Sequence, residues 1–267
     1  MNAPDLDLII PSYGGTDLLW RCLTHLWLFS PPGVRITVID DCAPDRSPQV
    51  GDWLIASGLA AYHRHAENRG CTAAWNTGIK ITEPEKAPFI GFINNDVLAM
   101  PGALETILGC MDAGAPFICA KEIVGEPGKP FDPAPLLRPQ RPSKVTLTEH
   151  FFGGLFVLDR SVVDEVGGFD ERMKQAFSDY DFLLRCHAIG VHPRVCEEAL
   201  VWHGGSVSAK RQGLMKAMVQ LRKDREVFNE KWKAHPKVLE HLGRQVPFED
   251  VIERGRENWE KSADAWN

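Results

Sequence analysis

The sequence lacks the long apolar segments and the cysteine motifs that mark membrane and secreted proteins. No apolar run in its 267 residues approaches the ~20 residues that a helix needs to cross a bilayer. The first residues, MNAPDLDLIIPSY, contain no basic segment followed by an apolar one, so we expect no signal peptide. The seven cysteines form no CxxC pair, which argues against a disulfide framework or a zinc site. We therefore expect a cytoplasmic protein with reduced thiols.

An excess of positive charge and the common phosphate-binding motifs are also missing. The formal net charge is -6, so we expect no general attraction to nucleic acid or anionic lipid. No GxGxxG motif follows the first apolar segment, which argues against an NAD-binding Rossmann enzyme. The stretch PSYGGTDLLWR has no basic residues at the spacing of a nucleotidyltransferase phosphate loop. Internal repeats are absent as well.

The sequence does contain apolar strands that alternate with amphipathic helices. We predict strands at residues 6–13, 34–39, 60–65 and 88–96, and helices at residues 16–29, 53–59 and 71–81. This alternation is typical of an α/β fold with a parallel sheet and right-handed crossovers. Ligands of such sheets bind beyond the carboxyl ends of the strands.

The second half of the chain has a less regular pattern. We predict a strand and a short helix within residues 151–171, a helix at 178–190, a strand at 192–203, and helical structure from about residue 209. The proline-rich segment 121–148 is either a lid over the site or a solvated connection. We expect one domain at residues 1–206 and a helical extension, residues 207–267, packed on it.

Polar residues occur where the predicted strands end. The apolar run that precedes Asn94 stops at the triplet Asn94, Asn95 and Asp96, and the second strand stops at Asp40 and Asp41. A carboxylate between groups that hold water suits Mg²⁺ or Mn²⁺, because these ions prefer oxygen ligands and also bind phosphate. The polar strand ends therefore mark the edge of the sheet where we expect a ligand to bind.

Seven stretches, in a fixed order, carry a resemblance to a known family. They are IIPSYGG, VIDDCAPD, ENRGCTAAWNTGI, FINNDVLAMPGAL, GGLFVLDRSVVDEVGGFDE, SDYDFLLR and VWHGGSVS. The chain resembles the family-2 glycosyltransferases of the GT-A fold, over about residues 6–206. The resemblance implies a mostly parallel, Rossmann-like sheet flanked by helices. It also implies a nucleotide-sugar donor, a divalent metal ion (Mn²⁺ or Mg²⁺), inversion at the anomeric carbon and a hydroxyl acceptor.

The resemblance assigns roles to the first strand ends. Asp96 would anchor the metal ion, and Asn95 would lie near the ribose or the diphosphate. Asp40 would recognise the nucleobase, with Pro11 and Tyr13 as the neighbouring wall.

Further residues would complete the donor site. Asp41 either contributes to it or caps the following turn. Asn68 and Arg69 would wrap the other side of the nucleotide, and Gly154 would let the backbone approach the donor sugar. Asn76 either forms hydrogen bonds within the fold or helps to line the donor pocket.

Two further assignments concern the metal ion and the acceptor. His203 would ligate the metal or contact the diphosphate, and Asp179 matches the catalytic base of the family. Asp181 would brace the site or pair with Arg185 four residues later. Alternatively, the first helical turn needs these polar residues only for capping, with Ser178 as the N-cap.

The chain departs from the family pattern at two positions. Asn94 replaces an acidic residue, so we expect weak metal binding until the donor arrives with its phosphate oxygens. Ser178 replaces the usual glutamate before Asp179, which affects the acceptor side.

We therefore predict an inverting, metal-assisted glycosyltransferase with a donor of the UDP type. The alternatives are an inactive relative that binds a nucleotide sugar and, less favoured, a nucleotidyltransferase. The acceptor is open between a glycan, a glycolipid and another hydroxyl compound, with modified nucleic acid not excluded. Basic residues of the C-terminal helix offer a peripheral membrane contact, but the interleaved Asp224, Glu226 and Glu230 favour a solvated face.

Overall fold

A computed structural model describes residues 5–45, 47–82, 87–123, 146–148, 151–203 and 214–235. The interior of the proline-rich segment, at 124–145, lies outside these ranges, and so does the predicted domain boundary near residue 206. The lid and the division into a domain and an extension therefore stay predictions. No helix of the described ranges is long and apolar enough to cross a membrane.

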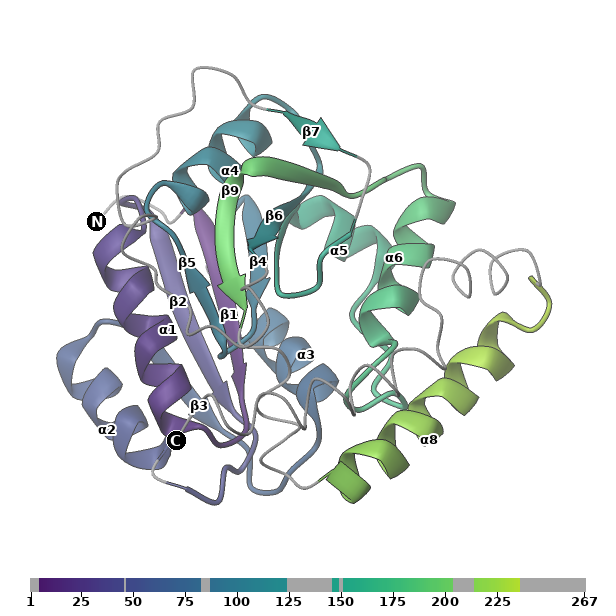
Figure 1. The fold of residues 1–267 in the computed structure, drawn as a ribbon, viewed down its shortest axis with the longest axis horizontal. Coiled ribbons are helices and arrows are strands. Elements are labelled where there is room, and N and C mark those ends of the chain that lie inside the picture. Colours follow the sequence, from purple (N-terminus) through teal and green to yellow (C-terminus); the bar gives the residue numbers. More distant parts are fainter. Residues whose placement is uncertain are drawn as a thin grey trace.

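The first half of the chain folds as the sequence pattern predicts (Figure 1). In order, its elements are β1 (Leu6–Ser12), α1 (Thr16–Phe29), β2 (Val34–Asp40), α2 (Ser47–Ser57), β3 (Ala61–Arg64), α3 (Cys71–Thr82) and β4 (Phe89–Ile93). β1 pairs in parallel with both β2 and β4, and β2 pairs in parallel with β3. The carboxyl ends of these strands therefore share one edge of the sheet.

The second half adds antiparallel pairs to the same sheet. Its elements are β5 (Val97–Ala99), α4 (Ala103–Asp112), β6 (Phe117–Ile123), β7 (Leu147–Thr148), β8 (Leu155–Asp159), α5 (Arg160–Val166), α6 (Ser178–Ala188), β9 (Arg194–His203) and α8 (Leu214–Trp232). The strand order is β3-β2-β1-β4-β8-β6-β9-β5, with β7 on β9. β8 runs antiparallel to β4 and β6, so the sheet is mixed, and the expected parallel pairing holds for β1 to β4 and for β6 with β9.

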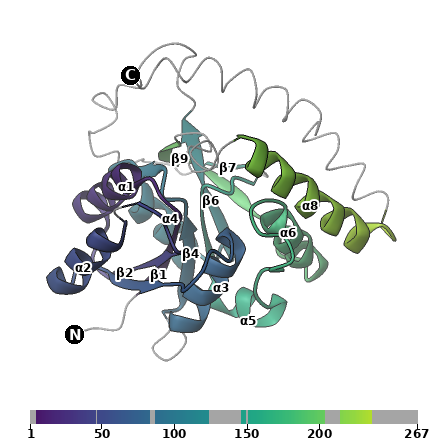
Figure 2. The same ribbon diagram turned by 90° about the horizontal axis from the view of Figure 1, so that it is seen from below.

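Helices cover both faces of the sheet. Along β1, Leu6, Leu8 and Ile10 face the core beneath α1, α2 and α4, whereas Ile9 faces the core beneath α3, α5 and α6. This alternation is the two-residue period of a strand that is buried on both faces. Figure 2 shows the two helical layers on opposite sides of the sheet.

α8 lies outside these layers, beside α6 (Figure 2). Its Phe228 is 1% exposed and packs with Met173 and Phe177, which precede α6. The apolar stripe of this helix therefore faces the rest of the protein.

A buried cluster of charged residues lies at the amino end of β1, opposite the polar strand ends. Asp7, at the start of β1, is fully buried. It accepts hydrogen bonds from Arg35 Nε at 2.6 Å, from the Ala87 N–H group at 3.0 Å, and from Arg160 Nη2. Arg160 also donates to Thr82 Oγ1 at 3.1 Å.

We expect Asp7→Ala to lower the free energy of unfolding by about 3–5 kcal/mol, because it leaves the buried Arg160 without its charged partner. The measurement is urea unfolding at fixed salt concentration. The matched control is Glu230→Ala, which removes one partner of an exposed pair with Lys233 on α8 and should cost about 1 kcal/mol or less. Equal losses in both variants would contradict this account of the cluster.

Candidate active site

Strand register brings Asp96 and His203 together, although they lie far apart in the sequence. β5 begins directly after Asp96 and pairs antiparallel with β9, with Val97 opposite His203. His203 Nε2 is 3.4 Å from Asp96 Oδ1. The Asp96 residue is only 4% exposed, so this pair lies within the protein at the polar edge of the sheet.

Glu122 holds the other side of the His203 ring. β6 pairs in parallel with β9 and places Glu122 opposite Val201, near the end of both strands. Glu122 Oε1 is 2.9 Å from His203 Nδ1. Burial opposes the charged imidazolium, but the hydrogen bonds and charges of Asp96 and Glu122 outweigh it and raise the pKa of His203 to about 9.

The donor atoms of this pair fit a divalent ion of the Mn²⁺ type. A carboxylate oxygen and an imidazole nitrogen converge, and Mn²⁺ accepts both, whereas Mg²⁺ prefers oxygen. Because only a neutral imidazole binds a metal ion, an ion bound here would displace the proton of His203 Nε2. Within the described ranges, no group of three or more His, Cys, Asp or Glu side chains is arranged to hold a metal. An ion held by Asp96 and His203 would therefore have coordination positions open to other molecules.

The amides beside Asp96 tie the site to two other loops. Asn95 Nδ2 donates to the Gly14 carbonyl oxygen at 3.2 Å and to Ser12 Oγ at 3.4 Å. The backbone N–H group of Asn94 donates to the Gly154 carbonyl oxygen at 3.0 Å. The triplet that ends β4 thus connects the loop after β1 with the start of β8.

Asp40 is fully buried and bound from three sides. Its oxygens accept hydrogen bonds from the Ala43 N–H group at 2.7 Å, from the Tyr62 hydroxyl at 2.5 Å, and from Arg64 Nη1. A carboxylate has about four acceptor positions, so little of it is left for a ligand. The structure gives Asp40 a role in holding β2 to β3, and direct nucleobase recognition stays a prediction.

Pro11 and Tyr13 flank the end of β1. Pro11 is buried within the strand, opposite Ile39 of β2, and Tyr13 is half-buried in the loop that follows. The wall that they would form beside Asp40 stays a prediction.

Asp41 organises the loop that leads into α3. Its carboxylate accepts hydrogen bonds from the backbone N–H groups of Arg69 at 2.8 Å and Gly70 at 2.7 Å. It also accepts one from His65 Nδ1 at 2.7 Å. We predicted that Asp41 either contributes to the donor site or caps the following turn. In the structure, its carboxylate binds the loop before α3 instead, so neither interpretation is favoured.

The side chains of Asn68 and Arg69 point into solvent at this loop. Both residues are exposed, and Arg69 Nη2 pairs with Glu171 Oε2 at 2.9 Å. Their predicted contact with the nucleotide stays untested by this geometry.

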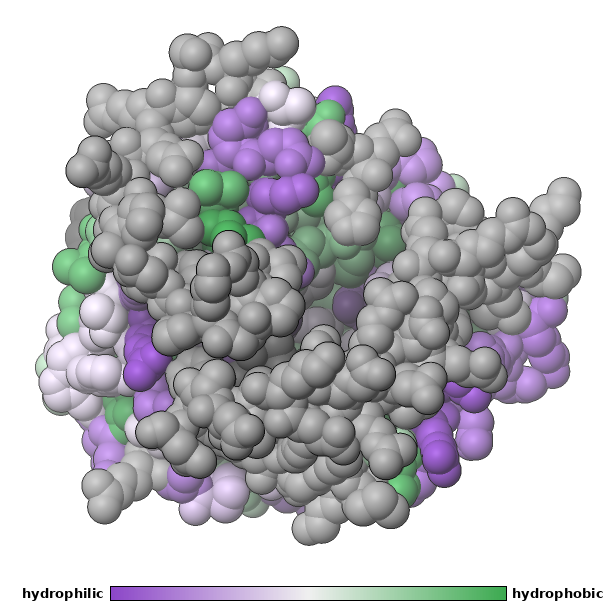
Figure 3. Space-filling model, viewed as in Figure 1, coloured by the Kyte–Doolittle hydropathy of each residue, from purple (hydrophilic) through white to green (hydrophobic). Residues whose placement is uncertain are grey.

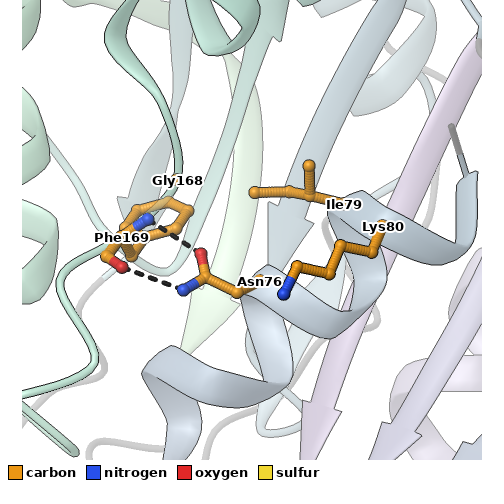
Figure 4. Close-up of a pocket in the computed structure, with 5 residues that line it drawn as sticks. All are labelled: Asn76, Ile79, Lys80, Gly168 and Phe169. Carbon is orange, nitrogen blue, oxygen red and sulfur yellow. Dashed lines mark hydrogen bonds between the residues drawn. The ribbon is translucent and has the colours of Figure 1, made fainter.

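Asn76 links α3 to the turn before α6 (Figure 4). Its Nδ2 donates to the Phe169 carbonyl oxygen at 2.9 Å, and its Oδ1 accepts from the Phe169 N–H group at 2.8 Å. Asn76 also lines a cavity of about 270 Å³ together with Ile79, Lys80, Gly168 and Phe169. This cavity shares no lining residue with the Asp96–His203 pair, and the structure thus favours hydrogen bonding within the fold over a donor contact.

Asp179 lies in the first turn of α6, and the backbone at Gly153 and Gly154 lies between it and the triplet that contains Asp96. A Cβ atom added to Gly153 would lie 2.9 Å from Asp179 Oδ2, and Gly154 is bonded to Asn94. Asp179 is half-buried, so protein surrounds its carboxyl group while part of it reaches solvent. Burial raises the pKa of Asp179, and the backbone N–H group of Tyr180, which donates to its Oδ1, only partly opposes this.

Cys71 marks the point on which the carboxylates converge. Burial, and then the nearby charges of Asp179, Asp41 and Asp96, raise the pKa of its thiol well above the usual range. The thiol therefore stays protonated at neutral pH. Asp41 and Asp96, from the loops after β2 and β4, and Asp179, from the first turn of α6, thus lie near the N-terminus of α3.

The other residues of the α6 first turn are structural. Phe177, not Ser178, is the N-cap of α6, which corrects the capping alternative. Ser178 is 2% exposed and shares a 2.8 Å hydrogen bond with the Thr72 hydroxyl. Asp181 accepts from Arg185 Nε at 3.0 Å, as the four-residue spacing predicts.

Aromatic side chains lie beside these polar groups. The Phe152 ring lies 5.7 Å from the His203 ring, and Phe151 lies 6.1 Å from Tyr180. A Cβ atom on Gly154 would clash with Phe152 at 2.2 Å, so the glycine lets this ring pack against the backbone. Figure 3 shows a recess near the middle of this face, where hydrophobic and hydrophilic surfaces meet.

The sequence profile of glycosyl transferase family 2 matches residues 7–169, more than half of the chain. The chain belongs to this family. Within glycosyl transferase family 2, it is similar to the pre-mycofactocin glycosyltransferase of Mycobacterium tuberculosis, with 28% identity over 74% of this chain and 42% of that protein. It spans between 26% and 42% of the length of the curated relatives that it matches.

Solved structures confirm the predicted GT-A fold. GalNAc-T7, crystallised with UDP, GalNAc and Mn²⁺, matches with a TM-score of 0.61 and 14% identity, over 76% of this chain and 44% of that one. The mannosyltransferase PcManGT of Pyrobaculum calidifontis, crystallised with GDP-Man and Mn²⁺, matches with a TM-score of 0.55 and 17% identity, over 84% and 66%. At these identities, the likeness concerns the fold.

Sequence reasoning missed several residues that shape this site. Glu122 lies near the end of β6, within the segment 121–148 that we interpreted as a lid or a connection, and no local pattern marks it as a partner of His203. Tyr62 and Arg64 are two residues apart on β3 and lie on the same side as Asp40. This spacing could have identified them once β2 and β3 were paired. Thr72 lies in ENRGCTAAWNTGI, and no local pattern there predicts that its hydroxyl contacts Met173 and Ser178.

We expect Asp41→Asn to loosen the loop before α3, because an amide accepts fewer hydrogen bonds than a carboxylate and its NH₂ group repels the facing N–H groups. Amide hydrogen exchange of Arg69 and Gly70 should accelerate by at least about tenfold, the equivalent of ~1.4 kcal/mol. The matched control is Arg69→Ala, which keeps both backbone N–H groups and should leave the exchange of Gly70 within about twofold of wild type. Unchanged exchange in Asp41→Asn would refute the assigned role.

Proposed function

We propose that the chain is an inverting glycosyltransferase that moves a sugar from a nucleoside-diphosphate sugar, of the UDP type, to a hydroxyl acceptor. The observation that carries the proposal is the Asp96–His203 pair at the strand ends, with Asp179 facing the same region beyond Gly153. Family membership and the GT-A fold support a sugar-transferring activity.

The donor would lie over the carboxyl ends of β1, β2 and β4. This edge holds Asp40, Asp41 and Asn95, and α3 begins at Cys71, near Asp41 and Asp96. Such a helix N-terminus favours a negatively charged diphosphate. Two structural relatives support the donor class, since one was crystallised with UDP and the other with GDP-Man.

Asp96 and His203 would hold the divalent ion, with Glu122 orienting the imidazole through Nδ1. When bound, the ion supplies positive charge to the departing diphosphate oxygens. Phosphate oxygens of the donor would supply further ligands, as the resemblance to the family implies. Mn²⁺ in the two relatives supports the choice of metal.

Asp179 would act as the general base. Its carboxylate takes the proton of the acceptor hydroxyl while the hydroxyl oxygen forms a bond to the anomeric carbon. The bond from that carbon to the diphosphate oxygen breaks on the opposite side, and the electron pair leaves with the nucleoside diphosphate. A single displacement of this kind inverts the anomeric configuration.

The acceptor is proposed only as a hydroxyl compound, which includes a glycan or a glycolipid. The expectation of a solvated face on the C-terminal helix is wrong at one position, and the membrane contact of its basic residues stays a prediction. Asp224, taken from the sequence as part of a solvated face, is fully buried. Lys210 and Arg211, which belong to the same basic stretch, lie outside the described residues.

The decisive test is donor binding and hydrolysis across a panel of nucleotide sugars, with Mn²⁺ and with EDTA. We expect metal-dependent hydrolysis of one donor, and a loss of about 10²-fold or more in Asp96→Ala, because one charge-stabilising group is gone. The control Asp112→Ala, at an exposed position on α4, should retain full activity. Donor binding without turnover or transfer would favour an inactive relative, and failure to bind any donor would refute the proposal.

Asp179→Asn should lower the transfer rate by about 10²–10⁴-fold with little change in donor affinity. A base must be ionised, so wild-type activity falls as the pH drops through the pKa of Asp179. Because burial raises that pKa, the acidic limb should lie above the usual range of an aspartate. The measurement is kcat/KM against pH.

The same variant should be at least as stable as wild type at neutral pH. A raised pKa means that the fold favours the protonated carboxyl group, and this stabilisation is lost as the pH rises through the folded pKa. An amide stays neutral at every pH. The control is Asp52→Asn, at an exposed position on α2, which should change neither rate nor stability. An acidic limb that persists in Asp179→Asn would show that another group is the base.

A further inference from the structure

The segment that delivers Asp179 to the site is bound by a carboxylate from α8. Asp224 Oδ1 accepts a hydrogen bond from the Lys174 N–H group at 3.0 Å. Asp224 Oδ2 accepts from the N–H groups of Gln175 at 2.8 Å and Ala176 at 3.0 Å. Three consecutive backbone N–H groups thus converge on one side chain, a few residues before α6 begins.

Burial of the Asp224 carboxylate would be unfavourable without these hydrogen bonds, so the residue has a structural role. The residue is fully buried, and an isolated buried carboxylate is strongly unfavourable. Gln220 Nε2 adds a fourth hydrogen bond at 2.7 Å, also to Oδ1. Charge-assisted hydrogen bonds to N–H groups are stronger than neutral ones, so the cluster holds the segment firmly.

The residue that follows the bound N–H groups has an unfavourable backbone conformation. Phe177 has φ 66, a value that a bulky side chain rarely adopts and that the surrounding structure must enforce. Its ring packs on Phe228 of α8, with ring centroids 5.6 Å apart, and its carbonyl oxygen accepts from the Asp181 N–H group at 2.8 Å. α8 thus restrains the residue that sets the entry angle of α6.

The loop before α3 contacts the same segment from the opposite side. The Thr72 hydroxyl donates to the Met173 carbonyl oxygen at 2.5 Å and is hydrogen-bonded to the Ser178 hydroxyl. A Cβ atom on Gly70 would lie 2.6 Å from the Lys174 carbonyl oxygen, so the two backbones touch. The segment at residues 173–178 is therefore held between the loop before α3 and α8.

A second set of contacts joins α8 directly to the first turn of α6. Asp181 Oδ1 accepts from Trp232 Nε1 at 3.1 Å and lies 2.7 Å from Lys231 Nζ. Asp181 is two residues from Asp179 and fully buried. α8 is thus attached both before and within the first turn of α6.

We propose that Asp224 is a positioning residue for Asp179, through which α8 fixes the general base against the donor side of the site. This inference rests on the proposed function, because it assumes that Asp179 accepts the acceptor proton. A displacement of the base of about 1 Å is enough to lower a rate ~10²-fold. Loss of the clamp should therefore slow transfer to the acceptor far more than it weakens donor binding.

The test compares Asp224→Asn with wild type and with Asp170→Asn. The amide in Asp224→Asn keeps the shape of the side chain but places an NH₂ group against backbone N–H donors. Asp170→Asn is the matched control, because Asp170 pairs with Lys231 of α8 but contacts none of the three N–H groups. Phe228→Leu is a second variant, which keeps Asp224 and loosens only the packing on Phe177.

Four quantities are measured: amide exchange of residues 174–176, donor affinity, the rate of transfer and the rate of donor hydrolysis. In Asp224→Asn we expect faster exchange, donor affinity within about twofold, and transfer lowered by about 10–100-fold. Hydrolysis by water should fall less, so the ratio of transfer to hydrolysis drops. Phe228→Leu should show the same pattern more weakly, and Asp170→Asn should resemble wild type.

Two results would overturn the inference, and they differ from failure of the proposed function. Faster exchange without a change in the ratio of transfer to hydrolysis would show that Asp224 serves stability alone. A parallel loss of donor affinity, transfer and hydrolysis would show a general disturbance of the fold. If wild type binds no donor, the proposed function itself fails, whatever the variants do.

Discussion

A carboxylate that leaves water must have its oxygens hydrogen-bonded, and much of this structure follows from that requirement. Asp7 binds the segment before β4 at the amino end of β1, Asp41 binds the loop before α3, and Asp224 binds the segment before α6. In each case, the donors include backbone N–H groups of a segment distant in sequence. Buried aspartates thus fix connections that apolar packing alone would leave variable.

The sheet supplies the second level of organisation. Parallel strands β1, β2 and β4 place their polar ends at one edge, as expected for an α/β fold. The antiparallel strand β5 then reverses direction immediately after Asp96 and pairs with β9. This change in direction builds the Asp96–His203 pair, so the mixed half of the sheet contributes as much to the site as the parallel half.

Local patterns in the sequence were sufficient for β1 to β4, α1, α3, α6 and β9, but they did not predict β5, β6 and β7 and placed the start of α2 at residue 53 instead of Ser47. The alternation along β1, the apolar face of α1 and the pairing of Asp181 with Arg185 depend on neighbours within a few residues. Glu122 was missed because its relation to His203 depends on the register of β6 and β9, which no local period records. Asp224 was misread for a similar reason. Helical periodicity identifies faces, but it does not reveal which backbone N–H groups another segment will present.

The register between β5 and β9 also limits how this protein can change in evolution. Between Asp96 and His203 the chain can gain or lose residues in its connections without separating the pair, since only the partner positions Val97 and His203 must coincide. Within β9 itself, a single inserted residue next to His203 would turn the imidazole to the opposite face of the sheet. Length variation among relatives should therefore accumulate between the strands, while the last residues of β9 keep their spacing.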